Sequence, residues 1–223
     1  MKEYELKDSD PEDVEDLILK IEDSLDIYFE ERELAYVKTF GQLCDHIKSK
    51  IKRVKTDDCT TQQAFYKFRN ALSESLNIDK KNITPDTLLS DILPKRTRIQ
   101  KIKEIDHSIG FNTSILRAHH FITNSLIVLL LASIVGLFFY WQYGLIGFVL
   151  SLVGFWVSNK MGNELDLKTV GEVAEKMTRE NYAKSRRNSE TYNEREIDQI
   201  ITDLFSDFFR LDKSKLTRDA EFN

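Results

Sequence analysis

Glycine, proline and cysteine are all scarce in this chain, whose 223 residues include 8 Gly, 3 Pro and 2 Cys. So few prolines and glycines exclude a collagen-like or low-complexity chain, and they disfavour an all-β fold with many tight turns. Two cysteines cannot build a disulfide scaffold. In a reducing compartment we expect Cys44 and Cys59 to be free thiols. The shortage of turn-forming residues therefore favours a helical protein.

Charge is missing as well, but from one region only. Lys, Arg, Asp and Glu make up 31% of the chain, yet residues 118–159 contain none of them. The charges elsewhere are unevenly placed, with a net −7 over residues 1–60, +4 over 61–117 and −2 over 160–223. The modest total of −5 therefore hides an acidic beginning, a basic stretch and a long uncharged block.

The uncharged block is almost continuously apolar between residues 124 and 159. A single helix of this whole uncharged length would measure roughly 63 Å, about twice the ~30 Å hydrocarbon core of a bilayer. Two spans of about 124–141 and 143–159 fit better, with the turn at Tyr140–Gly144. A buried hairpin in a soluble protein is the alternative, but the rest of the chain is too small to cover two helices that are apolar on every face. We therefore predict a transmembrane helical hairpin over 124–159.

Small residues recur at four-residue spacing in both predicted spans. The first span has Ala132 and Gly136, and the second has Gly147 and Ser151, after which Gly154 and Ser158 continue the stripe. Helices in lipid pack closely where side chains are small. We expect these residues to hold the two spans together, and contact between two copies of the chain, a homo-oligomer, is the alternative.

Basic residues flank the apolar block. A hairpin places both flanks on one side of the membrane, and the positive-inside rule predicts that this side is the cytoplasm. The chain is thus expected to be an integral protein of a bacterial-type inner membrane with both termini cytoplasmic. A basic membrane-proximal face is predicted from Lys95, Arg96, Arg98, Lys101 and Lys103. This face could contact anionic headgroups, worth about 1 kcal/mol per residue; it could instead hold an acidic protein patch or be merely solvated.

Two short motifs each occur twice. The first is Lys-Thr-Phe-Gly-Gln at residues 38–42, which returns as Lys-Thr-Val-Gly-Glu at 168–172. A Thr followed three residues later by Gln or Glu is a capping-box pattern, so each copy predicts the start of a helix. The second motif lies at 78–89 and returns at 211–222. The similar offsets predict that one structural unit is present twice.

Most of the remaining chain has apolar residues at helical spacing. Four such stretches predict amphipathic helices over 12–28, 62–76, 97–109 and 194–211. No stretch has the sustained alternation of a half-buried strand. The predicted fold class is therefore all-α.

These motifs resemble the acyl carrier protein family. The segment Asn-Ile-Asp-Lys-Lys-Asn-Ile-Thr-Pro-Asp-Thr-Leu-Leu-Ser-Asp-Ile at 77–92 looks like the first half of a carrier, following its first helix. The segments 38–43 and 168–173 look like the start of the last helix of that family. The resemblance covers nearly all of the chain outside 111–160. It implies small helical bundles, each with a compact apolar core.

The order of the pieces departs from the family, because segments that resemble the second half of a carrier precede those that resemble the first. In a nested arrangement, the parts are 1–53 with 193–223 as a terminal bundle, 61–116 with 161–180 as a central bundle, and 124–159 as the hairpin. In a sequential arrangement, 1–93 form a permuted bundle and 164–223 an incomplete one. We expect nesting, because it gives each bundle its principal helices.

A working carrier bears phosphopantetheine on a serine at the start of its second helix. In the central copy Arg96 occupies that position and cannot be modified. In the terminal copy the nearest serine is Ser9, two residues from the aligned position. We therefore expect that the carrier serine is lost and that the chain has no cofactor; the alternative that the resemblance leaves open is phosphopantetheine attached to Ser9. The alternative role for Ser9 is to cap a helix that begins near Pro11.

Patterns for other chemistry are missing from the sequence. The four histidines have no metal-ligand spacing with either cysteine, and no phosphate loop or catalytic motif is present. A pI of about 5.5 disfavours nucleic-acid binding. We therefore predict a non-catalytic, membrane-anchored docking or scaffold module whose partners are the lipid bilayer and a cytoplasmic protein. The alternatives are a membrane-tethered acyl carrier modified on Ser9 and an oligomeric membrane sensor or pore component.

Overall fold

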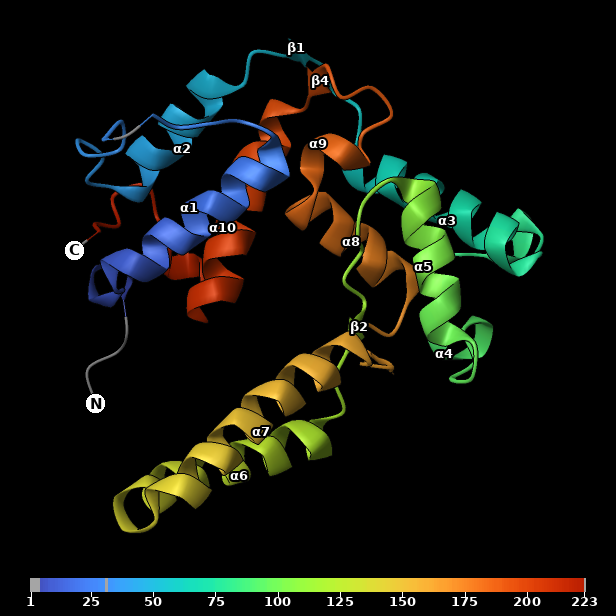
Figure 1. Cartoon of the computed structure of the whole chain (residues 1–223). Helices are drawn as coiled ribbons and strands as arrows, with labels where there is room; N and C mark the ends of the chain where they lie inside the picture. Colours follow the sequence, from blue (N-terminus) through green and yellow to red (C-terminus); the bar gives the residue numbers. More distant parts are fainter. Residues whose placement is uncertain (1–4, 31, 223) are drawn as a thin grey trace. The chain divides into compact units, whose positions relative to one another are not determined.

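The computed structural model describes residues 5–30 and 32–222, and within them it is predominantly helical, as predicted (Figure 1). The α-helices are α1 (Pro11–Leu25), α2 (Phe40–Lys50), α3 (Thr60–Leu76), α4 (Leu89–Ile92), α5 (Arg98–Ile109), α6 (His120–Phe139), α7 (Trp141–Lys160), α8 (Val170–Glu180), α9 (Tyr182–Ser185) and α10 (Glu194–Phe209). The described residues also form three short 3₁₀ helices, η1 (Leu6–Asp8), η2 (Lys80–Asn82) and η3 (Lys213–Lys215).

Strands are confined to two-residue pairs in the described ranges. Strand β1 (Val54–Lys55) pairs in parallel with β4 (Thr191–Tyr192), and β2 (Leu116–Arg117) pairs antiparallel with β3 (Glu164–Leu165). Both pairs join segments that are far apart in the sequence. Each pair connects the loops between helices by backbone hydrogen bonds.

The chain forms two compact units, each built from the described residues of its segments. Unit 1 combines residues 1–68 with 174–223, and unit 2 consists of residues 69–173. Helices α3 and α8 contribute residues to both units. The predicted division into carrier-like bundles has different boundaries and stays a prediction.

The core of unit 1 lies between α1, α2 and α10 (Figure 1). Their apolar faces follow the helical spacing seen in the sequence, and the fully buried side chains include Leu17, Ile21, Leu25, Ile47, Ile197, Ile201 and Phe205. The ring of Phe205 meets that of Phe40 edge-on, with 5.2 Å between centroids. Helix α1 begins at Pro11 because the side chain of Asp10 accepts the backbone N–H of Glu12 at 3.0 Å. Asp10, and not Ser9, is therefore the capping residue.

Unit 2 contains α4, α5, the α6–α7 hairpin and the adjoining parts of α3 and α8. The buried residues of α5 are Arg98, Ile102, Ile105 and Ile109, and the three isoleucines follow the predicted helical spacing, whereas the predicted Ile99 is half-buried. Helix α5 ends at Gly110, whose φ of 92° is the left-handed conformation that a glycine adopts without strain.

The second repeated motif folds the same way in both copies. Asn77 ends α3 with φ 55°, and Arg210 ends α10 with φ 54°. In each turn a serine hydroxyl donates a hydrogen bond to the carbonyl five residues later. These bonds are Ser73 Oγ to Ile78 O and Ser206 Oγ to Leu211 O, both at 2.7 Å. An aspartate then caps each following 3₁₀ helix, Asp79 for η2 and Asp212 for η3.

The first repeated motif docks onto the second in both copies. The backbone N–H of Gly41 donates to Arg218 O and that of Gly171 donates to Pro85 O, each at 2.8 Å. Two further pairs of bonds match. Phe40 N donates to Ala220 O at 2.8 Å, as Val170 N does to Thr87 O at 3.0 Å. In the opposite direction, Phe222 N donates to Lys38 O at 3.0 Å, as Leu89 N does to Lys168 O at 2.8 Å. The repeat seen in the sequence is therefore a repeated backbone junction.

Both predicted helix starts of the first motif are confirmed. Thr39 Oγ1 accepts the N–H of Gln42 at 3.3 Å, and Thr169 Oγ1 accepts the N–H of Glu172 at 3.2 Å. In turn, the side-chain oxygens of Gln42 and Glu172 accept the backbone N–H of Lys38 and of Lys168, respectively.

Candidate functional site

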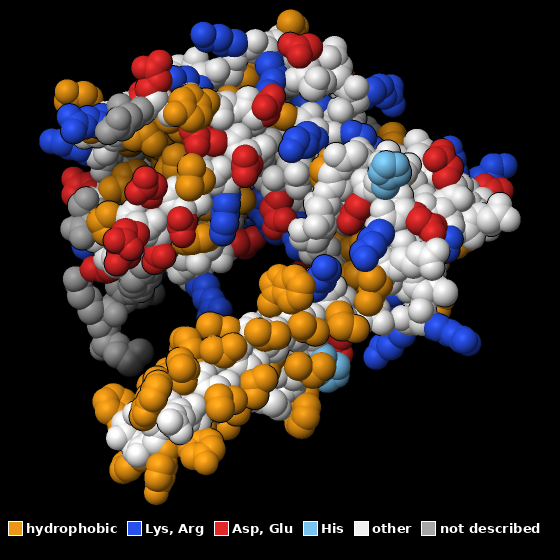
Figure 2. All heavy atoms as spheres, in the orientation of Figure 1, with side chains coloured by type: hydrophobic (Ala, Val, Ile, Leu, Met, Phe, Trp, Pro, Cys, Tyr) orange, Lys and Arg blue, Asp and Glu red, His pale blue; other side chains and the backbone are white. Residues whose placement is uncertain are grey.

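The α6–α7 hairpin is the most distinctive surface of unit 2. Each helix has 20 residues, which corresponds to about 30 Å, and is long and apolar enough to cross a membrane. Only 6% of the apolar window of α6 and 11% of that of α7 is buried. Figure 2 shows the apolar side chains spread along the hairpin. Tyr140 alone separates the helices, so the spans are longer than the predicted 124–141 and 143–159.

Small residues let the two helices approach closely. A Cβ on Gly147 would collide with Ser133 Oγ, and a Cβ on Gly144 would collide with the backbone of Leu137. On Gly154 it would lie 2.5 Å from Leu126 Cδ2, whereas Gly136 has room at 3.5 Å from Gly144 Cα.

The seam between α6 and α7 differs from the prediction at one residue. Ser151 is fully buried, and Ser133 is 5% exposed. Ala132 is exposed on the outer face. The seam advances by alternating steps of three and four residues, which is the spacing of left-handed helix pairs, so it passes through Ser133 instead of Ala132. These small residues are used for packing within one chain.

The end of the hairpin at which the chain enters and leaves it is hydrogen-bonded to the rest of unit 2. The guanidinium of Arg98 donates from Nε and Nη2 to Leu93 O at 2.9 and 2.8 Å, and from Nη1 to Asn163 O at 2.8 Å. Asn163 Nδ2 in turn donates to Lys95 O at 2.7 Å. Together with the β2–β3 pair, these bonds fix the chain where it enters and leaves the hairpin.

The predicted basic face is smaller than its sequence suggests. Arg98 is only 4% exposed, because its guanidinium holds the backbone of the hairpin base, and burial lowers the pKa of this group from its ordinary value. Lys101 is half-buried and donates to Ser75 O at 2.9 Å and to Glu104 Oε2 at 2.8 Å. Lys95, Arg96 and Lys103 are exposed. The free basic surface therefore consists of these three residues.

Ser9 lies in a different environment from that of an accessible modification site. It is 2% exposed, and its hydroxyl donates to Leu6 O at 2.5 Å. It borders a mainly apolar hollow of about 160 Å³ that Val14, Leu34 and Phe222 also line. The hydroxyl is thus engaged by the backbone of η1.

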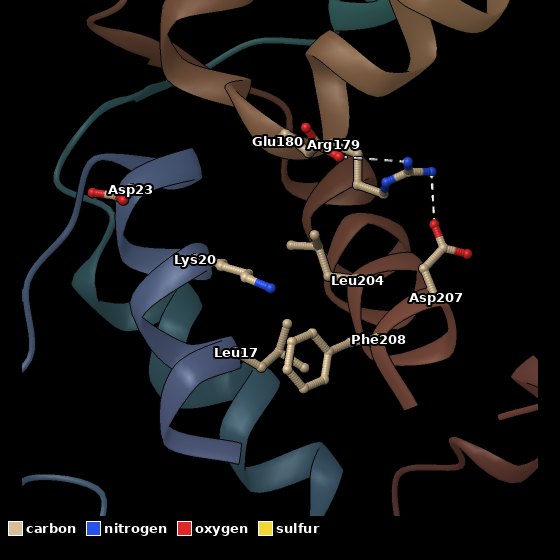
Figure 3. A pocket seen from close by; sticks show the side chains of 8 residues that line it. All are labelled: Leu17, Lys20, Asp23, Arg179, Glu180, Leu204, Asp207 and Phe208. Carbon is tan, nitrogen blue, oxygen red and sulfur yellow. Dashed lines mark ion pairs between the residues drawn. The ribbon is translucent and has the colours of Figure 1, made fainter. Parts of the chain in front are cut away.

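A larger hollow of about 440 Å³ lies between α1, α10 and the end of α8 in unit 1 (Figure 3). The ammonium of Lys20 sits 4.2 Å from the centre of the Phe208 ring. Arg179 pairs with Asp207 at 2.9 Å and with Glu180 at 3.8 Å. The lining combines both signs of charge with an aromatic ring, and its side chains include no nucleophile paired with a base.

Sequence reasoning missed a buried polar cluster in unit 1. The side chain of Arg186 is completely buried and donates to Thr56 Oγ1 at 2.7 Å and to Thr191 Oγ1 at 3.1 Å. Glu196 lies 3.8 Å from Arg186 and accepts the backbone N–H of Thr60 at 2.9 Å. The cluster joins the start of α3 to α10. An arginine between Lys184 and Arg187 in a polar stretch gives no signal that it alone of these three basic residues is buried.

Groups of three or more His, Cys, Asp or Glu arranged to hold a metal ion are not found among the described residues. Comparisons with protein-family models, with curated proteins and with solved structures give no match. The resemblance to acyl carrier proteins therefore rests on the quoted motifs alone, and function has to be argued from the geometry of the chain.

Proposed function

We propose that this protein is a membrane-anchored, non-catalytic docking module. Helices α6 and α7 span the membrane as a hairpin, and the soluble parts hold a cytoplasmic protein partner at its surface. In this proposal the membrane is a bacterial inner membrane and both termini lie on its cytoplasmic side.

The observation that carries the proposal is the uncovered apolar surface of α6 and α7, of which 6% and 11% are buried. Two helices of this kind in water would expose far more contiguous apolar surface than soluble monomers do. A bilayer covers that surface and matches the helix length of about 30 Å. Exposed aromatic residues at the turn, Tyr140, Trp141 and Tyr143, suit the opposite interface.

The orientation follows from charge. Lys95, Arg96 and Lys103 are exposed in the segment that precedes the hairpin, and the carbonyl of Lys95 accepts a bond from Asn163 Nδ2 just after it. Basic residues beside a membrane span favour the cytoplasmic side. Fastening by Arg98 and by the β2–β3 pair would keep these cations near the headgroups.

Insertion is tested by separating membranes from cytosol and washing them with alkaline carbonate. The full chain should stay in the washed membrane pellet. A variant with Leu131→Arg and Val149→Arg, which places charges on two exposed positions of the hairpin, should be released or degraded. Release of the unchanged chain by carbonate would contradict insertion.

Docking is tested on the hollow shown in Figure 3. A partner captured from native membranes by the full chain should be lost when Lys20→Glu reverses one charge of the hollow. Lys103→Glu, an exposed charge reversal in the other unit, should retain the partner. Equal capture by both variants would remove this hollow as the docking surface.

The second candidate, an acyl carrier modified on Ser9, is favoured by the apolar hollow beside that serine. Against it stands the burial of the hydroxyl, which a modifying enzyme would have to expose. Co-expression with a phosphopantetheinyl transferase followed by intact-mass measurement distinguishes the two. No adduct is expected; an adduct that Ser9→Ala abolishes would establish the carrier function.

A further inference from the structure

A hollow of about 520 Å³ lies at the membrane-proximal end of the hairpin, within unit 2. One part of its wall is apolar and comes from Ile122 and Leu126 of α6 and Val157 of α7. These side chains belong to the same helices whose surface is uncovered. If α6 and α7 span a bilayer, as proposed above, this wall borders the hydrocarbon region, and a lipid acyl chain is the group that reaches it.

The other part of the wall is polar and carries both signs of charge. Lys95 contributes an ammonium that has no ion pair among the residues the structure describes. Glu164 contributes a carboxylate that is 26% exposed and lies 3.2 Å from His119 Nε2. A cation and an anion on one rim match a headgroup that itself carries an anion and a cation.

Two side-chain atoms of the hollow also lack hydrogen-bond partners. Ser158 Oγ and Asn163 Oδ1 are covered from solvent and unpaired. The orientation of the Asn163 amide is fixed, because its Nδ2 donates to Lys95 O at 2.7 Å, so the unpaired atom is the acceptor. A buried acceptor without a donor is destabilising, because its lost contact with water is not replaced. A ligand that brings N–H donors supplies what this acceptor lacks.

We propose that this hollow binds a phospholipid whose headgroup carries a primary ammonium, as phosphatidylethanolamine does. The acyl region lies along Ile122, Leu126 and Val157. The phosphate lies at Lys95, and the ammonium lies toward Glu164 and Asn163. Phosphatidylcholine has the same charges but no N–H donor, and phosphatidylglycerol has no cation for Glu164.

The proposal is tested by native mass spectrometry of the full chain in detergent, with phosphatidylethanolamine, phosphatidylcholine and phosphatidylglycerol added at equal concentrations. Phosphatidylethanolamine should be retained at least about ten-fold more than either competitor, which is the smallest difference that one hydrogen bond to a charged group makes. Lys95→Ala should reduce retention about ten-fold. Arg96→Ala removes the same charge from the next residue, which does not line the hollow, and should leave retention unchanged.

Three results would overturn the proposal. Equal retention of phosphatidylcholine would remove the role of the donors. Stronger retention of phosphatidylglycerol would indicate simple charge attraction. Equal effects of the Lys95 and Arg96 variants would indicate that the lipid binds to the basic surface and not in the hollow. Resistance of the chain to carbonate extraction is measured separately, so a failure of lipid selectivity is distinguishable from a failure of membrane insertion.

Discussion

Arg96 and Arg98 stand two residues apart, carry the same charge and have opposite surroundings. Arg96 is exposed, whereas Arg98 is 4% exposed and bonds to the backbone of Leu93 and Asn163. The sequence assigned both to one basic surface, because charge is visible in a sequence and burial of a charged side chain is not. The planar guanidinium can satisfy two separate carbonyl groups at once. Arg98 is therefore a structural residue.

This difference predicts the effects of two alanine substitutions. Arg98→Ala leaves Leu93 O and Asn163 O without their buried donors, so it should lower the free energy of unfolding by about 1–3 kcal/mol. Arg96→Ala should change it by less than about 0.5 kcal/mol. Thermal unfolding of the detergent-solubilised chain measures both. Equal stability of the two variants would mean that the hairpin base does not depend on Arg98.

At the scale of elements, much of the helical framework follows from local sequence signals. Capping boxes at Thr39 and Thr169 predicted two helix starts that the structure confirms. Apolar spacing predicted the buried faces of α1, α5 and α10. The start of α1 was placed by its proline, but the capping residue is Asp10 because its side chain reaches the N–H of Glu12. Such details depend on backbone angles that composition does not encode.

The two repeated backbone junctions, at Gly41 and at Gly171, should differ in how well they tolerate an added methyl group. A Cβ on Gly41 would lie 2.7 Å from Arg218 O, whereas on Gly171 it would lie 3.1 Å from Pro85 O. The backbone at Arg218 therefore has to move to admit a methyl group on Gly41, whereas the backbone at Pro85 has to shift only slightly to admit one on Gly171. Gly41→Ala should destabilise by about 1–3 kcal/mol, and Gly171→Ala by less than about 1 kcal/mol. Chemical denaturation of both variants measures the difference, and a larger loss for Gly171→Ala would contradict the geometry.

Among the small residues predicted to line the contact between α6 and α7, the glycines lie in that contact, but Ala132 does not. A sequence shows which residues are small, but the phase of the contact depends on how the helices supercoil. The seam passes through Ser133, and Ala132 lies on the outer face.

Two leucine substitutions in the hairpin should therefore differ. Gly147→Leu collides with Ser133 and should destabilise the hairpin by about 1–3 kcal/mol. Ala132→Leu, on the exposed face, should be nearly neutral. Unfolding in detergent micelles, followed by near-ultraviolet circular dichroism, distinguishes them. A destabilising Ala132→Leu would place the seam where the sequence had suggested it.

At the scale of the whole molecule, unit 1 is assembled from segments that lie more than a hundred residues apart, since the buried residues of α1 and α2 share one core with those of α10. The repeated motifs hinted at such an assembly and favoured the nested over the sequential arrangement, and that choice stays a prediction. The buried Arg186 cluster gave no hint at all, because its partners come from separate parts of unit 1. Long-range pairing is set by packing energy, which local patterns do not report.

Membrane topology gives the most direct test of the whole-molecule proposal. Cys44 is 3% exposed, and burial raises the pKa of its thiol to about 12, so it should not react with maleimide in the folded chain. Cys59 is exposed in unit 1, and Gln142→Cys would place a thiol at the hairpin turn. A membrane-impermeant maleimide should label Gln142→Cys, in a Cys59→Ser background, from the outside of intact spheroplasts. Native Cys59 should react only after the membrane is permeabilised, because a hairpin keeps both soluble units on the side opposite its turn. Labelling of both thiols from the same side would contradict a hairpin that crosses the membrane.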